Sequence, residues 1–265
     1  MTVSAPVEAL VSAVRAALAE HADPVRGARQ QAYMKSSLPY LGVPKPVLTS
    51  ALRTPLTSHI LGSRAEWEAG VRALVSQAAY REEWYAALAL AGHRHYRAWA
   101  SEPAALELYQ WVVTRTQWWD VVDEVAAHRV GGVLAAHRES VTPLVRVWSV
   151  DGDDLWLRRT AILSQLRCGP ATDLELLSDV LVANLSGSTF GETFWIRKAV
   201  GWSLRTYAAT DAAWVRAFVR RTRRPAVGTE PSRGPQVPGL GTRACHQPRP
   251  PHHSARGEGQ RHTSS

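Results

Sequence analysis

Cysteine is nearly absent from this chain of 265 residues, which contains only Cys168 and Cys245. The two lie far apart, and neither belongs to a Cys/His cluster with the spacing of a tetrahedral metal site. The sequence therefore predicts no disulfide framework and no structural zinc. We expect a protein that works without metal or cofactor in a reducing cytoplasm.

Long apolar runs are missing as well. No uninterrupted apolar stretch approaches the roughly 18 residues that suggest a membrane span. The N-terminus has no basic leader and interrupts its apolar residues with Glu8 and Arg15,. The sequence predicts neither a visible export signal nor a contact with the membrane.

Several catalytic motifs are also absent. The chain has no glycine-rich phosphate loop, no HExxH, no GxSxG and no CxxC. These patterns mark phosphate-binding loops, zinc proteases, serine hydrolases of the α/β-hydrolase type and thiol redox enzymes. Their absence argues against these four classes of protein.

The net charge of +8 is concentrated at one end of the chain. The last 45 residues contain 8 Arg against Glu230 and Glu258, which leaves little net charge on residues 1–220. Bulk charge on the folded part therefore says little about its partners. The same 45 residues contain seven Pro and six Gly but no aromatic residue.

We accordingly predict a folded domain over residues 1–224 and a disordered tail over residues 225–265, because the tail has too little apolar surface to offset the entropy of ordering. The composition of the tail also resembles translation of a GC-rich gene in a shifted frame. The hypothesis that the chain is an inactive product of a damaged gene therefore stays open.

Residues 5–220 have helical periodicity and no convincing alternating strand. In the first stretch, apolar residues recur at steps of three and four, namely Val7, Leu10, Val11, Val14 and Leu18. Similar stretches follow near 24–36, 45–53, 64–77, 80–99, 103–114, 118–136, 139–149, 153–167, 173–185, 191–208 and 210–220. Pro143 marks a predicted break, and Asp153 and Thr210 are predicted N-caps.

Tryptophan supplies an internal repeat. Trp84, Trp119, Trp156 and Trp195 are separated by 35, 37 and 39 residues, each near the start of a helical stretch. This period predicts an all-α fold, an α-solenoid of HEAT-like helical repeats with a concave groove. The alternative is an irregular helical bundle in which the tryptophans are core residues.

Equivalent positions after each tryptophan collect chemistry-bearing side chains. Three and four residues further on, which is the same helix face, the successive units carry Asp123, Arg159 and Lys198. With Trp119 and Trp202, these would line a groove with one acid, cations for phosphates and aromatic faces for a sugar or base. The alternative to a binding groove is structural: the tryptophans would be core residues, and the basic residues would be solvated on a helix surface. The neighbouring Asp120 could cap its helix.

Four motifs resemble, in order and spacing, those of the AlkD-like DNA alkylation repair enzymes, which are HEAT-like-repeat DNA glycosylases. They cover roughly residues 5–220 and read QAYMKSSLPYLGVPKP, WWDVVDEVAAHRVGG, WLRRTAILSQL and FWIRKAVGWSLRTYA. The family's closing motif, similar to P-L-S-x-R-E-A, is missing here. The sequence therefore lacks the segment that the resemblance implies for closing the C-terminal end of the solenoid.

The resemblance implies roles for individual residues. Asp123 would be the catalytic carboxylate, with Trp119 and Trp202 presenting aromatic faces beside it. The implied phosphate and DNA contacts are Tyr33, Lys35, Arg159, Lys198 and Arg205. The family grips the backbone around a lesion and leaves the modified base in the duplex.

The implied activity is hydrolysis of the N-glycosidic bond of cationic N3- or N7-alkylated purines. The partner would be double-stranded DNA containing alkylated bases, bound by a monomer. A purine that is already cationic can leave without a general acid, so one carboxylate suffices to stabilise the sugar cation. The competing interpretation is a non-catalytic HEAT-like module that binds DNA or protein.

Overall fold

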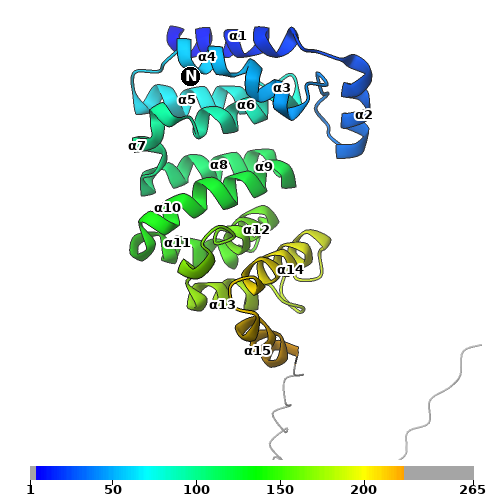
Figure 1. The fold of residues 1–265 in the computed structure, drawn as a ribbon, viewed down its shortest axis with the longest axis vertical. Helices are drawn as coiled ribbons and strands as arrows, with labels where there is room; N and C mark the ends of the chain where they lie inside the picture. The colour runs from blue at the N-terminus through cyan, green and yellow to red at the C-terminus, as the bar shows by residue number, and fades with distance from the viewer. Residues whose placement is uncertain (1–3, 224–265) are drawn as a thin grey trace, which may run out of the picture. The chain divides into compact units, whose positions relative to one another are not determined.

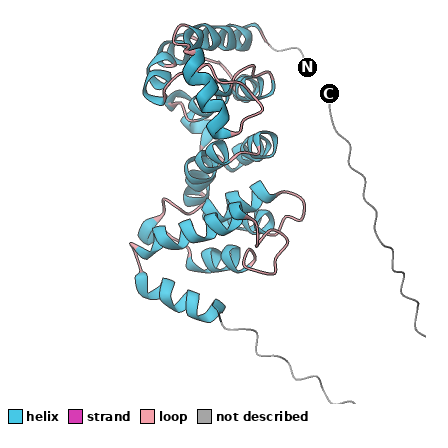
Figure 2. Ribbon diagram, turned by 90° about the vertical axis from the view of Figure 1, so that its right-hand side faces the viewer, coloured by secondary structure: helices cyan, strands magenta, loops and turns pink. Residues whose placement is uncertain are grey.

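The computed structural model describes residues 4–223, in which the only regular secondary structure is helical, with loops between the helices and no strand (Figure 2). The predicted tail, residues 225–265, lies outside the described residues. The α-helices are α1 (Ala5–Ala19), α2 (Pro24–Met34), α3 (Lys45–Ala51), α4 (Arg53–Ser58), α5 (Arg64–Ser76), α6 (Arg81–Ala91), α7 (Arg97–Ala100), α8 (Leu106–Thr116), α9 (Trp119–Glu124), α10 (Gly131–Ala136), α11 (Arg138–Ser149), α12 (Leu155–Leu163), α13 (Leu174–Val182), α14 (Phe194–Ala208) and α15 (Ala212–Arg223). A π-helical turn, η3 (Val125–Val130), joins α9 to α10, and short 3₁₀ turns are η1 (Arg94–Tyr96), η2 (Pro103–Ala105) and η4 (Gly169–Ala171).

The helices stack in chain order (Figure 1). Helix α1 packs on α5, α5 packs on α6 and α8, and α8 packs on α9 and α12. Helix α12 then contacts α11 and α14, and α14 contacts α15. Each helix pair buries its apolar face against the next pair, which is the arrangement of an α-solenoid. The predicted fold class is confirmed.

The core follows the predicted helix faces. In α1, the five apolar residues at steps of three and four are all buried: Val7, Leu10, Val11, Val14 and Leu18. Burying an aliphatic side chain of this size contributes about 1.5–3 kcal/mol. Because most of the helices contribute such a face, apolar contacts hold the stack together.

Three predicted helix boundaries are wrong. The N-cap of α12 is Asp154, whose carboxylate accepts the backbone N–H groups of Trp156 and Leu157, and not Asp153. Asp211 caps α15 by accepting the N–H of Trp214 at 2.8 Å, so Thr210 is not the cap. Helix α11 also continues through Pro143 and is not broken there.

Helix α10 approaches α12 through a glycine. A Cβ on Gly131 would lie 2.4 Å from the carbonyl oxygen of Ser164, whereas one on Gly132 would meet nothing within 4 Å. Gly131 therefore permits close contact between the two helices, and Gly132 has no such role.

This pair of glycines gives a stability prediction with an internal control. Gly131→Ala forces α10 away from α12 and should lower the free energy of unfolding by about 1–3 kcal/mol. Gly132→Ala should raise it by about 0.5–1 kcal/mol, since alanine loses less entropy in a helix. Urea denaturation measures both, and equal effects of the two substitutions would contradict the packing described.

Candidate active site

Asp123 lies on α9 with both carboxylate oxygens bound by one arginine. Arg159 Nε donates to Oδ1 at 2.7 Å, and Arg159 Nη2 donates to Oδ2 at 2.9 Å. The remaining nitrogen, Nη1, donates to the carbonyl oxygen of Trp195. Because Arg159 belongs to α12 and Trp195 to α14, one guanidinium joins the three helices α9, α12 and α14 at Asp123.

This ion pair is nearly enclosed. The side chain of Arg159 is 2% exposed and that of Asp123 is 14% exposed. Burial raises the pKa of Asp123 above its ordinary value of 3.8, and the negative charge of Asp120 acts in the same direction. Hydrogen bonds and charge from Arg159, together with the charge of Lys198, lower the pKa and oppose that rise.

Asp123 keeps capacity to act on a ligand. Each of its oxygens accepts one hydrogen bond from Arg159, and a carboxylate oxygen has two lone-pair positions. One position on each oxygen is therefore unused by the contacts within residues 4–223. A carboxylate that is oriented by a bidentate arginine and retains open positions can stabilise a developing positive charge or orient a water molecule.

A second carboxylate on α9, that of Asp120, is more fully occupied. Its Oδ1 accepts from Arg81 Nη2 at 2.5 Å and from the backbone N–H of Val121 at 3.0 Å, and its Oδ2 accepts from the Tyr85 hydroxyl at 2.5 Å. Its side chain is 13% exposed, much like that of Asp123. Three donors nonetheless leave it less free to act on a ligand.

The suggestion that Asp120 caps its helix is wrong. The N-cap residue of α9 is Trp118, which makes no side-chain capping hydrogen bond. Asp120 lies in the first turn, where a negative charge is favourable,. Its carboxylate instead connects α9 to Arg81 and Tyr85 of α6.

Three tryptophans form a triangle beside the Asp123–Arg159 pair. The ring centroids of Trp118, Trp156 and Trp195 lie 6.2, 5.8 and 5.6 Å apart. The repeat predicted from the sequence used Trp119 as the counterpart of the other two, but Trp118 is the residue that packs with them. Trp118 has an extended backbone at φ −143°, so its ring is directed differently from that of a residue inside the helix.

The two other aromatic residues predicted for the site are partly buried. Trp119 opens α9, four residues before Asp123, so the two share a helix face,. Trp202 lies on α14, the helix whose backbone also binds Arg159. Both rings pack against the core and keep part of their surface exposed.

The five residues predicted to contact DNA divide into two groups. Four are exposed: Tyr33, Lys35, Lys198 and Arg205. Tyr33 is 82% exposed, and Lys35 follows it at the end of α2 in a left-handed conformation with φ 50°. Arg159 is buried against Asp123, and contact with a phosphate would require it to leave that carboxylate.

Sequence reasoning missed Arg81, Tyr85 and the carbonyl of Trp195. Arg81 begins a run of three charged residues, Arg81 to Glu83, which looks like a solvated start of a helix. All three are buried in the structure, with exposures of 3% or less. A run of charges with aromatic neighbours was the available signal, but the partners lie far away in the sequence.

Comparison with known proteins identifies the family of this chain. The family model described as DNA alkylation repair enzyme matches residues 14–234, a range that contains both members of the Asp123–Arg159 pair. The chain belongs to this family of DNA alkylation repair enzymes. Membership makes DNA its partner.

A solved structure of a family relative has the same fold. It is that of a predicted DNA alkylation repair enzyme from Enterococcus faecalis, with 26% sequence identity and a TM-score of 0.66. The match covers 76% of this chain and 90% of that one. Nothing among the curated proteins matches the chain.

Two further observations apply to the described residues of this family member. Within residues 4–223, no helix has the length and apolar character needed to cross a membrane. Over the same residues, His, Cys, Asp and Glu side chains form no group of three or more that could hold a metal ion.

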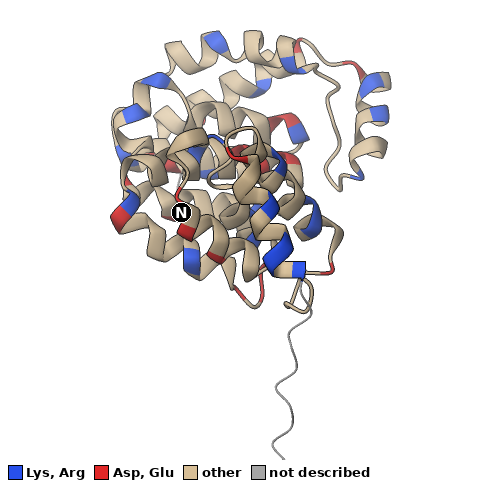
Figure 3. Cartoon of the chain, turned by 60° about the horizontal axis from the view of Figure 1, so that its bottom comes forward, with Lys and Arg blue, Asp and Glu red and all other residues tan. Residues whose placement is uncertain are grey.

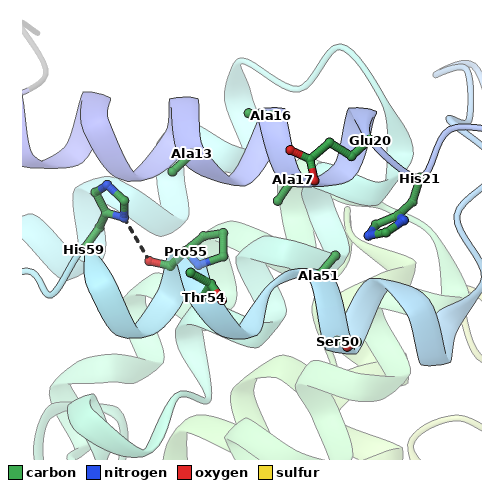
Figure 4. Close-up of a pocket in the computed structure, with 10 residues that line it drawn as sticks. All are labelled: Ala13, Ala16, Ala17, Glu20, His21, Ser50, Ala51, Thr54, Pro55 and His59. Carbon is green, nitrogen blue, oxygen red and sulfur yellow. Dashed lines mark hydrogen bonds between the residues drawn. The ribbon is translucent and has the colours of Figure 1, made fainter.

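A cavity of about 520 Å³ lies away from Asp123, between α1 and the helices α3 and α4. Four of its ten lining residues are alanines, and its two histidines, His21 and His59, lie at opposite ends (Figure 4). His59 Nδ1 donates to the carbonyl oxygen of Pro55 at 3.2 Å. The residues predicted for catalysis and DNA binding do not line it.

Proposed function

We propose that this DNA alkylation repair enzyme is a DNA glycosylase that hydrolyses the N-glycosidic bond of cationic N3- or N7-alkylated purines in duplex DNA. The observation that carries the proposal is Asp123: a nearly buried carboxylate that is oriented by one bidentate arginine and has an open position on each oxygen. A binding module would have no need for such a group.

The chemistry requires only one carboxylate. Alkylation at N3 or N7 places a positive charge on the purine, so the C1′–N bond breaks with both electrons going to the ring, and the base leaves neutral. The positive charge passes to the sugar as an oxocarbenium-like cation. Water then adds to C1′ and loses a proton, which leaves an abasic site.

Asp123 would stabilise the sugar cation and orient the attacking water. Arg159 would act as a positioning residue, because its two hydrogen bonds to Asp123 fix the orientation of the carboxylate,. The exposed parts of Trp119 and Trp202 would offer aromatic faces to the sugar or to the cationic base.

Exposed side chains on α2 and α14 would hold the DNA backbone. Figure 3 shows basic residues along α2, and this helix also carries the exposed Tyr33. On α14, Lys198 and Arg205 are exposed. Cations and hydroxyls of this kind contact phosphates and set the position of a protein on duplex DNA.

Asp123, Arg159 and Trp195 all come from one chain. We therefore propose that the protein acts as a monomer. Because its partner is DNA, we also propose that it acts in the cytoplasm, on the nucleoid of a bacterial cell.

The proposal is tested with two duplexes that differ in the charge of the target base. One carries N7-methylguanine, which is cationic, and the other carries uracil, which is neutral. We expect release of N7-methylguanine alone, because a neutral base needs protonation that this site does not supply. Binding without release would favour the non-catalytic module, and equal release of both bases would contradict the proposed mechanism.

A further inference from the structure

Helix α2 stands to one side of the stacked helices (Figures 1 and 3). It carries Tyr33 and, just after its last turn, Lys35, both of which the sequence predicts to contact DNA. If these side chains are to act on the same stretch of DNA as Asp123, the position of α2 relative to α9 must be fixed. The polar contacts that link the two helices run through the segment after α2 and through α6.

Helix α2 is attached to the segment that follows it, residues 36–44, called here the anchor loop. The backbone N–H of Asp23 donates to the carbonyl of Leu41 at 2.8 Å, and Arg26 Nη1 donates to the carbonyl of Gly42 at 2.9 Å. The contact is close, because a Cβ on Gly27 would lie 2.4 Å from the carbonyl oxygen of Tyr40. These contacts attach helix α2 directly to the anchor loop.

Helix α6 holds the anchor loop through one buried carboxylate. Glu82 accepts the backbone N–H groups of three consecutive loop residues, Leu41, Gly42 and Val43, at 2.9, 2.9 and 3.2 Å. Its side chain is fully buried, at 0% exposure. Hydrogen bonds to a carboxylate are stronger than those to a neutral acceptor, so Glu82 fixes the backbone of the loop to α6.

A chain of hydroxyls extends the connection from the loop to α9. Tyr85 on α6 donates its hydroxyl proton to Asp120 Oδ2 at 2.5 Å. Since that proton is used, the hydroxyl of Tyr40 must donate to the Tyr85 oxygen, 3.0 Å away. Burial and the negative charge of Asp120 raise the pKa of Tyr85, which keeps this hydroxyl protonated and the direction of the chain fixed.

Arg81 completes the connection. Its side chain is 3% exposed and binds Asp120, while its backbone N–H donates to the carbonyl of Pro39 in the anchor loop at 2.9 Å. Buried ion pairs contribute little net stability but can fix one arrangement of the chain. The continuous path therefore begins at α2, crosses α6 and ends on α9, three residues before Asp123.

We propose that Glu82, Tyr85 and Asp120 are positioning residues that hold α2 in register with Asp123, so that both engage one stretch of duplex DNA. The inference rests on the proposed function, in which α2 and Asp123 act on the same DNA. Its test measures DNA binding and helix protection, and neither depends on base release.

The test compares Tyr85→Phe with Tyr109→Phe in the full chain. Tyr85→Phe keeps the ring and removes the hydroxyl that links Tyr40 to Asp120. Tyr109→Phe is the matched control, because the Tyr109 hydroxyl also makes a partly buried hydrogen bond, to the carbonyl of Ala100 at 2.8 Å, outside this path. For each variant, amide hydrogen exchange is followed in residues 24–34, and affinity for an undamaged duplex is measured at low salt.

We expect Tyr85→Phe to increase exchange selectively in residues 24–34 and to weaken duplex binding several-fold, with neither effect in Tyr109→Phe. In a Tyr33→Ala background, Tyr85→Phe should cost much less affinity, because both changes remove the contribution of α2. Unchanged exchange in α2, an equal increase across the whole chain, or fully additive affinity losses would overturn the proposal. If the unmodified protein binds the duplex but releases no base, the proposed function fails while this test still applies.

Discussion

Asp123→Asn should lower the single-turnover rate of base release by about 100-fold or more, the size of effect seen when one preorganised electrostatic contact to a transition state is removed. Asparagine has nearly the same shape and can still accept a hydrogen bond from Arg159, but it carries no negative charge for the sugar cation. Affinity for duplex DNA should persist or increase, since the substitution removes a charge that repels phosphate.

The matched control for this substitution is Glu124→Gln on the same helix. Glu124 lies 3.6 Å from both His128 and Arg129 and is partly exposed, so its loss removes a negative charge without touching the Asp123–Arg159 pair. Base release at the unmodified rate in Asp123→Asn would contradict the role of Asp123. A rate loss in Glu124→Gln as large as that in Asp123→Asn would show that the charge effect is not specific to the site.

Arg159→Ala should remove most activity at neutral pH and leave the salt dependence of DNA binding unchanged. Without the guanidinium, only the charge of Lys198 still opposes the effect of burial, so the pKa of Asp123 should rise further above 3.8,. A protonated carboxyl cannot stabilise a cation, and the acidic limb of the rate profile should therefore move to higher pH. Raising the pH ionises the group again and should restore part of the rate.

Salt dependence separates this role from a phosphate contact. A residue that binds a phosphate contributes a slope of about one to the plot of log affinity against log salt concentration, and a buried Arg159 contributes none. Lys198→Ala is the comparison. Because Lys198 is exposed and is proposed to contact DNA, this substitution should reduce the slope. A reduced slope in Arg159→Ala would mean that Arg159 leaves Asp123 to bind DNA.

Loss of one member of a buried ion pair is also costly for folding, at about 3–5 kcal/mol. Arg159→Lys provides a second variant that keeps the charge but loses the two parallel hydrogen bonds. We expect it to unfold at a higher temperature than Arg159→Ala and to show an intermediate rate. Activity of Arg159→Lys equal to that of the unmodified protein would show that the bidentate geometry is not needed.

Sequence patterns were sufficient for the elements that depend on local periodicity. The burial of Val7, Leu10 and Val14 on one face of α1 follows from their spacing, and so does the all-helical stack. Cap residues were less certain, because Asp153 and Asp154 are adjacent and both can cap; the structure uses Asp154. Which of two adjacent residues caps the helix depends on the packing of the whole helix.

Some features of the site could also be predicted from the sequence, and others could not. Asp123 and Arg159 could both be selected, from the tryptophan spacing and from a motif, but their contact could not, since 36 residues separate them in the sequence. The sequence position of Arg159 suited a phosphate contact as well as an ion pair. Only the packing of α9 against α12 decides between the two. The link from Tyr85 to Asp120 escaped prediction for the same reason.

The most direct measurement of the central claim uses a duplex with one N7-methylguanine at a defined position, incubated with excess protein. Free base is quantified by mass spectrometry, and the abasic site is located by cleavage with alkali. The account predicts stoichiometric release of the methylated base and strand cleavage at that position, both lost in Asp123→Asn. A duplex that is bound by the protein but stays intact would contradict the assignment of a glycosylase.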